Sequence, residues 1–110
     1  MAKDSLGEFE HQVLLAVLRL GDETYSVPIV LELEDRTGRE VAPAAVYIVL
    51  RRLEEKGLAE SEMRGAPEGE AGRSRRYFCV TKSGIGRLRE SRRRLTRLWE
   101  GLDPVLEASE

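Results

Sequence analysis

The stretch APAAVYIVLRRLEEKGL, residues 42–58, decides the fold of this chain. It predicts a helix over about 43–56, because Pro43 suits the first turn of a helix and Gly57 suits the residue just after one. Two stripes run along this helix at spacings of three and four residues, which places them on different faces. The first stripe is apolar and suits burial: Val46, Val49, Leu50 and Leu53. The second mixes chemical types: Ala44, Tyr47, Ile48 and Arg51.

The segment before this stretch predicts a second helix over about 26–37. Ser26 has the side chain of a helix N-cap, and Pro28 falls in the first turn, where its missing N–H does no harm. Gly38 suits the stop. Only four residues, 38–41, then separate the two predicted helices, which is the short connection of a helix-turn-helix.

A further helix is expected at the start of the chain, over about 5–20. Ser5 and Glu8 have the three-residue spacing of a capping box. From Val13 onward the segment is apolar on nearly every side, which indicates burial on more than one face.

Downstream of Gly57 the pattern changes from helical to extended. Residues 58–64 predict a short strand, and residues 76–80 are rich in strand-forming side chains. Between them, residues 65–74 have the glycine and proline content of a loop. Two strands around such a loop, directly after a helix-turn-helix, predict a wing.

The C-terminal part predicts one long helix over about 83–102. Its large apolar residues repeat at heptad-like spacing: Leu88, Leu95, Leu98, Trp99 and Leu102. Gly84 and Gly86 weaken its first turns. Residues 103–110 are expected to form a tail after the helix, and residues 1–82 to form the domain that precedes it.

The formal net charge of −2 hides an uneven distribution of charge. Residues 1–70 carry 8 Lys and Arg against 15 Asp and Glu, a net of −7. Residues 71–97 carry 10 Lys and Arg against one acid, a net of +9. Because a phosphate backbone responds to the local field and not to the total charge, the basic segment favours a nucleic-acid partner.

The composition argues against several classes of protein. With one cysteine, Cys79, and one histidine, His11, no disulfide within the chain is possible and a zinc site is remote. No apolar run approaches the roughly 20 residues that cross a bilayer, and residues 1–4 open no signal peptide. The sequence offers neither a nucleophile–base pair nor a phosphate-cradling glycine motif. We therefore expect a cytoplasmic protein that is not an enzyme and needs no cofactor.

Three strings in the right order resemble the PadR-like family of winged-helix transcriptional regulators. LGEFE and VLLAVL, within residues 6–18, are similar to the first helix of that family. AVY and LRRLEEKGL, within 45–58, are similar to its recognition helix, and GRSRRYF and VTKSG, within 72–84, to its wing return. The resemblance implies a mainly α fold with a small two-stranded β wing, a winged helix-turn-helix followed by a single C-terminal dimerisation helix.

The resemblance also implies a homodimeric repressor that pairs through its C-terminal helix together with its first helix. The side chains at those positions are Leu6, Phe9, Leu88, Leu95, Leu98, Trp99 and Leu102. In some family members a tryptophan on the last helix stacks on flat, apolar ligands. Trp99 therefore has two interpretations, the favoured one being packing between subunits and the other contact with a small aromatic effector.

A family member of this kind places its third helix in the major groove of double-stranded DNA and its wing near the minor groove. Two such helices about one DNA turn apart, roughly 34 Å, predict an imperfect palindrome as the operator. Phosphate contacts are expected from one cation of the third helix, three wing cations and the start of the second helix. These residues are Arg51, Arg73, Arg75, Arg76, Tyr25 and Ser26.

Base reading falls to the first turns of the third helix, at Pro43, Ala44, Tyr47 and Ile48. None of these supplies the bidentate pairing of Arg with guanine or of Asn with adenine. Many family members carry a hydroxyl or a glycine near Ala44, from which this chain departs. Direct readout is therefore expected to be limited to thymine methyl groups and the Tyr47 hydroxyl, with DNA shape and the wing arginines adding specificity.

Several of these residues have a second interpretation. Tyr47 is expected to contact DNA, and the alternative is that its ring packs under the wing. The arginine run at residues 92–94 is more typical of a solvated face, paired with acids of the first two helices, than of a DNA contact. Cys79 is more typical of a small hydrophobe than of a redox switch.

Two alternatives compete with the leading interpretation of a DNA-binding regulator. The acidic residues 1–70 and the apolar start of the third helix favour a winged-helix module that binds protein and not DNA. The arginines beside the glycine-rich loop count against such a module. Among DNA binders the second candidate is the MarR-like group, whose chains are usually longer and carry additional dimerising helices.

Overall fold

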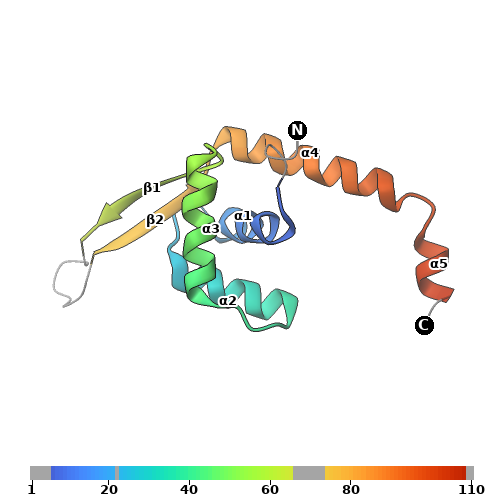
Figure 1. Cartoon of the computed structure of the whole chain (residues 1–110), viewed down its shortest axis with the longest axis horizontal. Coiled ribbons are helices and arrows are strands. Elements are labelled where there is room, and N and C mark those ends of the chain that lie inside the picture. Colours follow the sequence, from blue (N-terminus) through green and yellow to red (C-terminus); the bar gives the residue numbers. More distant parts are fainter. Residues whose placement is uncertain (1–5, 22, 66–73, 109–110) are drawn as a thin grey trace.

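The computed structural model of the chain describes residues 6–21, 23–65 and 74–108. Three helices are followed by a two-stranded antiparallel sheet and then by a long and a short helix (Figure 1). This mainly helical arrangement with a small wing confirms the predicted fold class. The elements are α1 Glu8–Leu20, α2 Ser26–Thr37, α3 Pro43–Glu55, β1 Ala59–Arg64, β2 Arg75–Val80, α4 Lys82–Trp99 and α5 Asp103–Ala108.

The core lies where α1, α2 and α3 meet the base of the wing. α1 is buried along one broad face, with Val13, Leu14 and Val17 fully enclosed. The expected burial on more than one face is wrong for the single chain, because Leu15 and Leu18 on the other side are exposed. Phe78 of β2 and Leu88 of α4 close the core from the sheet and from the last long helix. The remaining core side chains are Ala16, Ile29, Val30, Leu33, Val46, Val49, Leu50, Leu53, Leu58 and Ala59.

The start of α1 differs from the predicted capping box. The N-cap is Gly7, and Glu10 supplies the carboxylate, with its Oε1 accepting a hydrogen bond from the Gly7 N–H at 2.9 Å. The expected pairing of Ser5 with Glu8 is therefore wrong in register, since Glu8 is the first helical residue; Ser5 itself lies outside the described residues.

Glu10 also joins the first helix to the end of the third. Its side chain is buried, and both of its carboxylate oxygens lie 3.0 Å from Nζ of Lys56. Burial works to raise the pKa of Glu10, but the Gly7 N–H and the Lys56 ammonium outweigh it, so the pKa lies below its ordinary value. The carboxylate thus stabilises the fold in its ionised form.

Glu10→Gln is expected to lower the free energy of unfolding by about 1–3 kcal/mol at neutral pH, because Lys56 loses its charged partner. Since the pKa of Glu10 is lowered on folding, its stabilisation is present above the ordinary pKa of a carboxyl and is lost as the pH falls through the folded-state pKa. Urea denaturation from roughly pH 7 to pH 3 should show the variant and the parent converging at the acid end. A gap of constant size over that range would contradict the assignment.

The wing pairs β1 with β2 in antiparallel register, from Ala59 opposite Val80 to Arg64 opposite Arg75. An isolated bridge adds Thr24, whose N–H and C=O both bond to the backbone of Phe78 at 3.1 and 2.7 Å. Because side chains alternate along a strand, one face of the wing turns toward α3 and the other toward the segment before α2. Arg75 and Arg76, neighbours in sequence, therefore lie on opposite faces.

Close packing at the start of α4 requires glycine at position 84, one of the two glycines that weaken the first turns of this helix. Thr81 caps the helix, with its Oγ1 accepting from the Gly84 N–H at 3.0 Å. A Cβ at Gly84 would lie 2.1 Å from the carbonyl oxygen of Leu58 and 2.7 Å from Cγ1 of Val80. A Cβ at Gly86 would meet nothing within 4 Å. Gly84 thus permits α4 to approach the backbone before β1.

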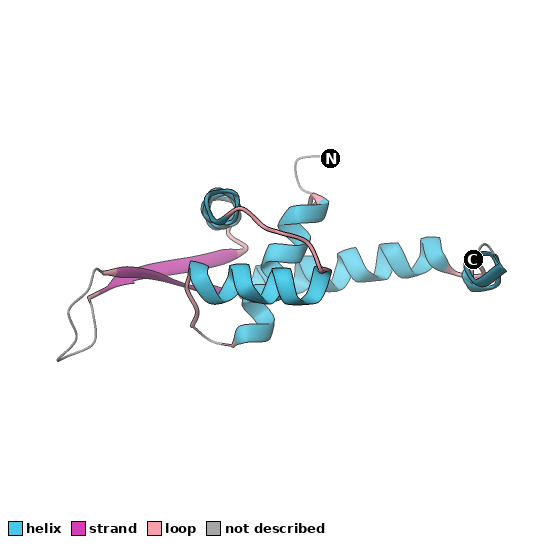
Figure 2. Ribbon diagram, turned by 90° about the horizontal axis from the view of Figure 1, so that it is seen from below, coloured by secondary structure: helices cyan, strands magenta, loops and turns pink. Residues whose placement is uncertain are grey.

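The C-terminal end of the chain differs from the expected helix and tail. α4 ends at Trp99 and not near Leu102, because Glu100 leaves the helical conformation with ψ 129° and Gly101 follows with φ +80°, a region that favours glycine. Asp103 then opens α5, where Pro104 is tolerated in the first turn. Figures 1 and 2 show α4 leaving the three-helix body and carrying α5 at the end of the molecule away from the wing. The molecule extends 57 Å along its longest axis.

Candidate nucleic-acid interface

The outward face of α3 carries the residues predicted to read bases. Pro43, Ala44, Tyr47 and Ile48 are exposed, while the opposite stripe of the same helix is buried in the core. This face is therefore apolar, apart from one tyrosine, over its first two turns. Its chemistry suits contact with thymine methyl groups better than hydrogen bonding to base edges.

Tyr47 combines the two interpretations that the sequence left open. Its ring meets Phe78 of β2 edge-to-face, with the ring centroids 6.4 Å apart and the planes at 82°. The residue is nevertheless 42% exposed. The wing thus supports the ring of Tyr47 without enclosing it, and its contact with DNA stays a prediction.

A chain of polar contacts ties α3 to both strands of the wing. Nη1 of Arg51 lies 3.2 Å from Oε1 of Glu54, and Oε2 of Glu54 accepts a hydrogen bond from Ser61 at 2.7 Å. The Ser61 hydroxyl in turn accepts from Nη1 of Arg76 at 2.9 Å. Two residues of this chain of contacts were predicted to bind phosphate. Arg51 is exposed, whereas Arg76 is half-buried against the helix.

The other face of the wing presents Arg75 on an aromatic support. Its guanidinium lies 4.6 Å from the ring centroid of Tyr25, and the Tyr25 ring lies 5.5 Å from that of Tyr77. Such stacking orients a guanidinium while leaving its N–H groups available to a phosphate. The structure thus gives Tyr25 a supporting position through its ring, where the sequence suggested a role for its hydroxyl.

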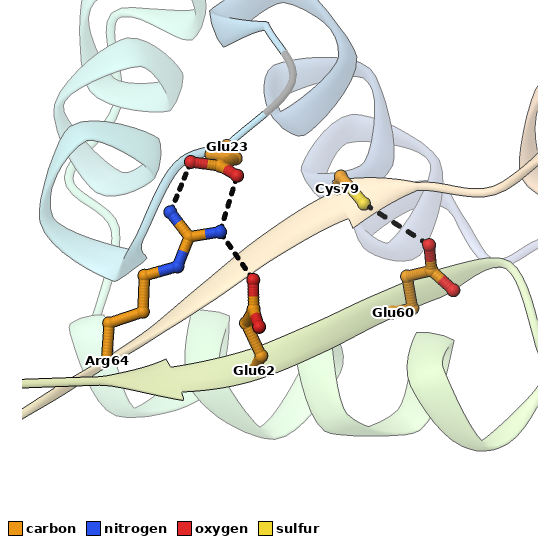
Figure 3. Close-up of polar contacts among 5 residues, drawn as sticks. All are labelled: Glu23, Glu60, Glu62, Arg64 and Cys79. Atoms are coloured by element: carbon orange, nitrogen blue, oxygen red, sulfur yellow. Dashed lines mark hydrogen bonds and ion pairs between the residues drawn. The ribbon is translucent and has the colours of Figure 1, made fainter.

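Arg64 lies opposite Arg75 in the register but is held by acids. It forms ion pairs with Glu23, on the segment before α2, and with Glu62 of its own strand (Figure 3). The hydrogen bond from Arg64 holds the pKa of Glu23 below its ordinary value. On the same face, Sγ of Cys79 lies 3.7 Å from Oε1 of Glu60 (Figure 3). This part of the wing is acidic and internally paired, so it suits phosphate poorly.

Sequence reasoning omitted two residues of this face, Arg64 and Tyr77. Tyr77 contacts Arg64 directly, with the guanidinium 5.1 Å from its ring centroid, and contacts the Tyr25 ring that lies under Arg75. The alternation of the strands was the available signal, because it places Tyr77 and Arg75 on one face. Arg73, also predicted to contact phosphate, lies outside the described residues.

The phosphate contact predicted at the start of α2 stays a prediction, and the cap of this helix differs from the expected one. Tyr25 is its N-cap and makes no side-chain capping bond, so the prediction that Ser26 caps the helix is wrong. Ser26 is instead the first helical residue and is half-buried. The N–H groups of this turn point out of the helix end, where a helix favours an anion.

The residues assigned to dimerisation fall into two groups. Leu6 and Phe9 are partly buried against the core, and Leu88 is 6% exposed within it, so Leu88 is unavailable to another chain in this conformation. The others form an exposed apolar stripe on α4 and the turn that follows: Leu95, Leu98, Trp99 and Leu102.

The arginine run at residues 92–94 lies on an exposed part of α4. Arg94 pairs with Glu90, one turn earlier on the same helix. Two acids of the first two helices have other partners, since Glu10 pairs with Lys56 and Glu32 with two arginines of α1 and α2. The observed ionic partner of the run is thus Glu90 of the same helix and not an acid of the first two helices, and its assignment to a solvated face stays a prediction.

No cluster of three His, Cys, Asp or Glu side chains is placed to hold a metal ion in residues 6–21, 23–65 and 74–108. Within the same ranges, every helix is too short or too polar to cross a membrane.

Three packed helices, a two-stranded wing beside the third of them and a projecting last helix define the winged helix-turn-helix class. A family model described as "Transcriptional regulator PadR-like family" matches residues 14–90, from the middle of α1 to the middle of α4. The chain belongs to the PadR-like family, whose members regulate transcription and are not enzymes.

Individual relatives agree with this assignment. The chain is 41% identical over 63 residues to transcriptional regulator Rv3488 of Mycobacterium tuberculosis, an alignment that covers 57% of this chain and 55% of the relative. The chain thus spans little more than half the length of that relative. A PadR family regulator from Eggerthella lenta is 29% identical, with a TM-score of 0.69 over 86% of this chain and 80% of its own. A PadR-like regulator from Bacillus cereus has the same fold, with a TM-score of 0.70 at 19% identity over 89% and 90%.

Proposed function

We propose that this chain is a homodimeric repressor that binds an imperfectly palindromic operator in double-stranded DNA, with α3 in the major groove and the wing at the minor groove. The observation that carries the proposal is the exposed face of α3 beside the wing, on which Arg75 is held by a tyrosine support. Because a transcriptional regulator must reach the chromosome, we propose that this protein is located in the cytoplasm.

The proposed contacts divide into those that hold phosphate and those that meet bases. Arg75 and Arg51 are exposed cations on either side of the junction between wing and helix, and the first turn of α2 adds N–H groups. The base-facing residues are Pro43, Ala44, Tyr47 and Ile48. Since this set offers few hydrogen bonds, we expect DNA shape to supply much of the specificity.

Dimerisation is proposed through the exposed apolar stripe of α4 and the turn that follows it, which ends in Trp99 and Leu102. Exposure of this apolar stripe to water is unfavourable, and a partner subunit that covers the stripe would stabilise the folded chain. Trp99 is 50% exposed, so its ring is accessible to a flat aromatic effector as well as to the partner. Quenching of this lone tryptophan by aromatic compounds would support an effector, and no change across a panel would count against one.

The test is a titration of labelled DNA from the upstream region of the gene, followed by fluorescence anisotropy at several salt concentrations. Specific binding should be at least about a thousandfold tighter than binding to scrambled DNA, and should weaken steeply with salt. Binding without preference would mean an operator elsewhere. An absence of binding at low salt would favour the second candidate, a protein-binding module, which the apolar face of α3 also suits.

Arg75→Gln is expected to reduce the slope of log affinity against log salt by about 2 for the dimer, one phosphate contact for each subunit. The matched control is Arg64→Gln on the opposite strand, which loses the same charge. Because Glu23 and Glu62 already neutralise Arg64, its replacement should leave the slope nearly unchanged. Equal changes for the two variants would refute the assignment of Arg75 to phosphate.

A further inference from the structure

An open groove runs between α1 and α2, on helices that the proposed DNA contacts use only at the start of α2. Its volume is about 440 Å³. Its apolar lining comes from both helices, and two of its leucines are largely exposed, Leu15 at 46% and Leu18 at 43%. Ala16 and Leu33 form its buried apolar part. Exposed leucines lining a groove favour an apolar occupant.

The rim of this groove carries an excess of positive charge. Arg19 of α1 and Arg36 of α2 both turn to Glu32, at 3.8 and 2.7 Å from its Oε2. Two cations thus share one carboxylate, which leaves one net positive charge at the mouth. An occupant that brings carboxylates beside its apolar side chains would match both features.

The chain itself contains a segment with this chemistry. Leu102, Val105 and Leu106 have the three- and four-residue spacing of one helical face, and all three are exposed. Asp103 and Glu107 flank that face one turn apart, and residues 98–110 contain four acids and no base. The turn before Asp103 and α5 together form an apolar surface edged by negative charge.

This segment cannot be the occupant of its own groove in the observed conformation. Figures 1 and 2 both place α5 well away from α1 and α2, at the far end of α4. All described residues of α5 are exposed. A second copy of the chain removes the difficulty, because a projecting helix can deliver α5 to a neighbouring molecule.

We propose that α5 of one subunit docks in the α1–α2 groove of the other, and that the exchange is reciprocal. Val105 and Leu106 enter the groove, while Asp103 and Glu107 meet Arg19 and Arg36 at its rim. The proposal rests on the homodimer proposed above and adds a second contact to the α4 stripe. The short helix then acts as a clamp across the dimer.

A disulfide trap tests the placement directly. In a full-length Cys79→Ser background, Leu15→Cys in the groove is combined with Leu106→Cys on α5. Mild oxidation should convert most of the protein to a covalent dimer on a non-reducing gel. The control replaces Leu15→Cys by Arg52→Cys, an exposed position of α3 outside the groove, and should give only traces. A disulfide that closes within one chain, or no disulfide, would overturn the proposal.

Charge reversal tests the rim. Arg36→Glu and Glu107→Arg should each raise the dissociation constant of the dimer about tenfold by sedimentation equilibrium, and the double variant should recover to near the parent value. Arg39→Glu, an equal change at an exposed position outside the groove, should have little effect. A purely structural role for Arg36 predicts no recovery in the double variant, which would count against the clamp.

The outcomes separate this proposal from the proposed function. A parent protein that dimerises and binds its operator but forms no trapped dimer overturns the clamp alone. A trapped dimer that binds no DNA supports the clamp and overturns the function. A parent that stays monomeric at every concentration overturns both.

Discussion

Gly84→Ala is expected to lower the free energy of unfolding by about 2–4 kcal/mol, enough to leave a chain of this size marginally folded. The added Cβ would lie 2.1 Å from the carbonyl oxygen of Leu58. The obstruction is backbone and not a flexible side chain, and the same carbonyl accepts a hydrogen bond from the Thr81 N–H at 3.1 Å. Relief therefore requires α4 to shift away from the wing. Urea denaturation measures the loss.

The matched control for this variant is Gly86→Ala, two residues further along α4. Nothing lies within 4 Å of a Cβ at that position, so alanine should stabilise the helix by up to about 1 kcal/mol through its higher helix propensity. The two substitutions are chemically identical and are expected to act in opposite directions. If Gly84→Ala were as stable as the parent, the close approach of α4 to Leu58 would be wrong.

Leu98→Gln is expected to weaken operator binding at least about a hundredfold, because a monomer reads one half-site and loses the gain from linking two. Leu98 is 72% exposed in the single chain, so the substitution removes no contact of the core. The expected effect thus falls on association and not on folding. Sedimentation equilibrium and fluorescence anisotropy on the same samples should show both losses together.

Arg97→Gln serves as the control for Leu98→Gln. It introduces the same side chain one residue earlier, about 100° around the helix and away from the apolar stripe. It should leave the dimer intact and change DNA affinity only by the loss of one exposed charge. Operator binding by Leu98→Gln at the parent level would contradict the assignment of this stripe to the dimer interface.

The helix stops were predictable because they depend on one residue and its own backbone. Gly38 and Gly57 adopt φ +71° and +77°, a region that favours glycine, and they end α2 and α3 where the sequence places those ends. The buried stripe of α3 was equally accessible, since a spacing of three and four residues defines a face without knowledge of what covers it.

Features that depend on distant contacts were not predictable in the same way. The carboxylate that caps α1 also pairs with Lys56, 46 residues away, and no local pattern announces that partner. From the local sequence, Gly84 is only a residue that weakens a helix. The need for glycine at this position follows from the Leu58 carbonyl oxygen, which would lie 2.1 Å from a Cβ. Gly101 was overlooked because the heptad-like spacing continues through it to Leu102.

The candidate site was predictable in composition but not in arrangement. The sequence identified the wing arginines and Tyr47, yet it could not assign their partners. Strand alternation separates Arg75 from Arg76, and the nearby acids neutralise Arg64 while leaving Arg75 on its tyrosine support. Which arginine has a free charge depends on the register and on the segment before α2, neither of which is a local property.

The polar chain from Arg51 through Glu54 and Ser61 to Arg76 bears on any attempt to re-target this protein to a new operator. Transplanting the outward residues of α3 from a relative would change the surface that meets DNA, but the helix is oriented by partners in both wing strands. A graft that replaces Glu54 without a matching residue at Ser61 would break this chain of contacts, and Arg76 would lose the link through which it is tied to α3. The exchangeable unit of specificity is thus the helix together with the base of its wing.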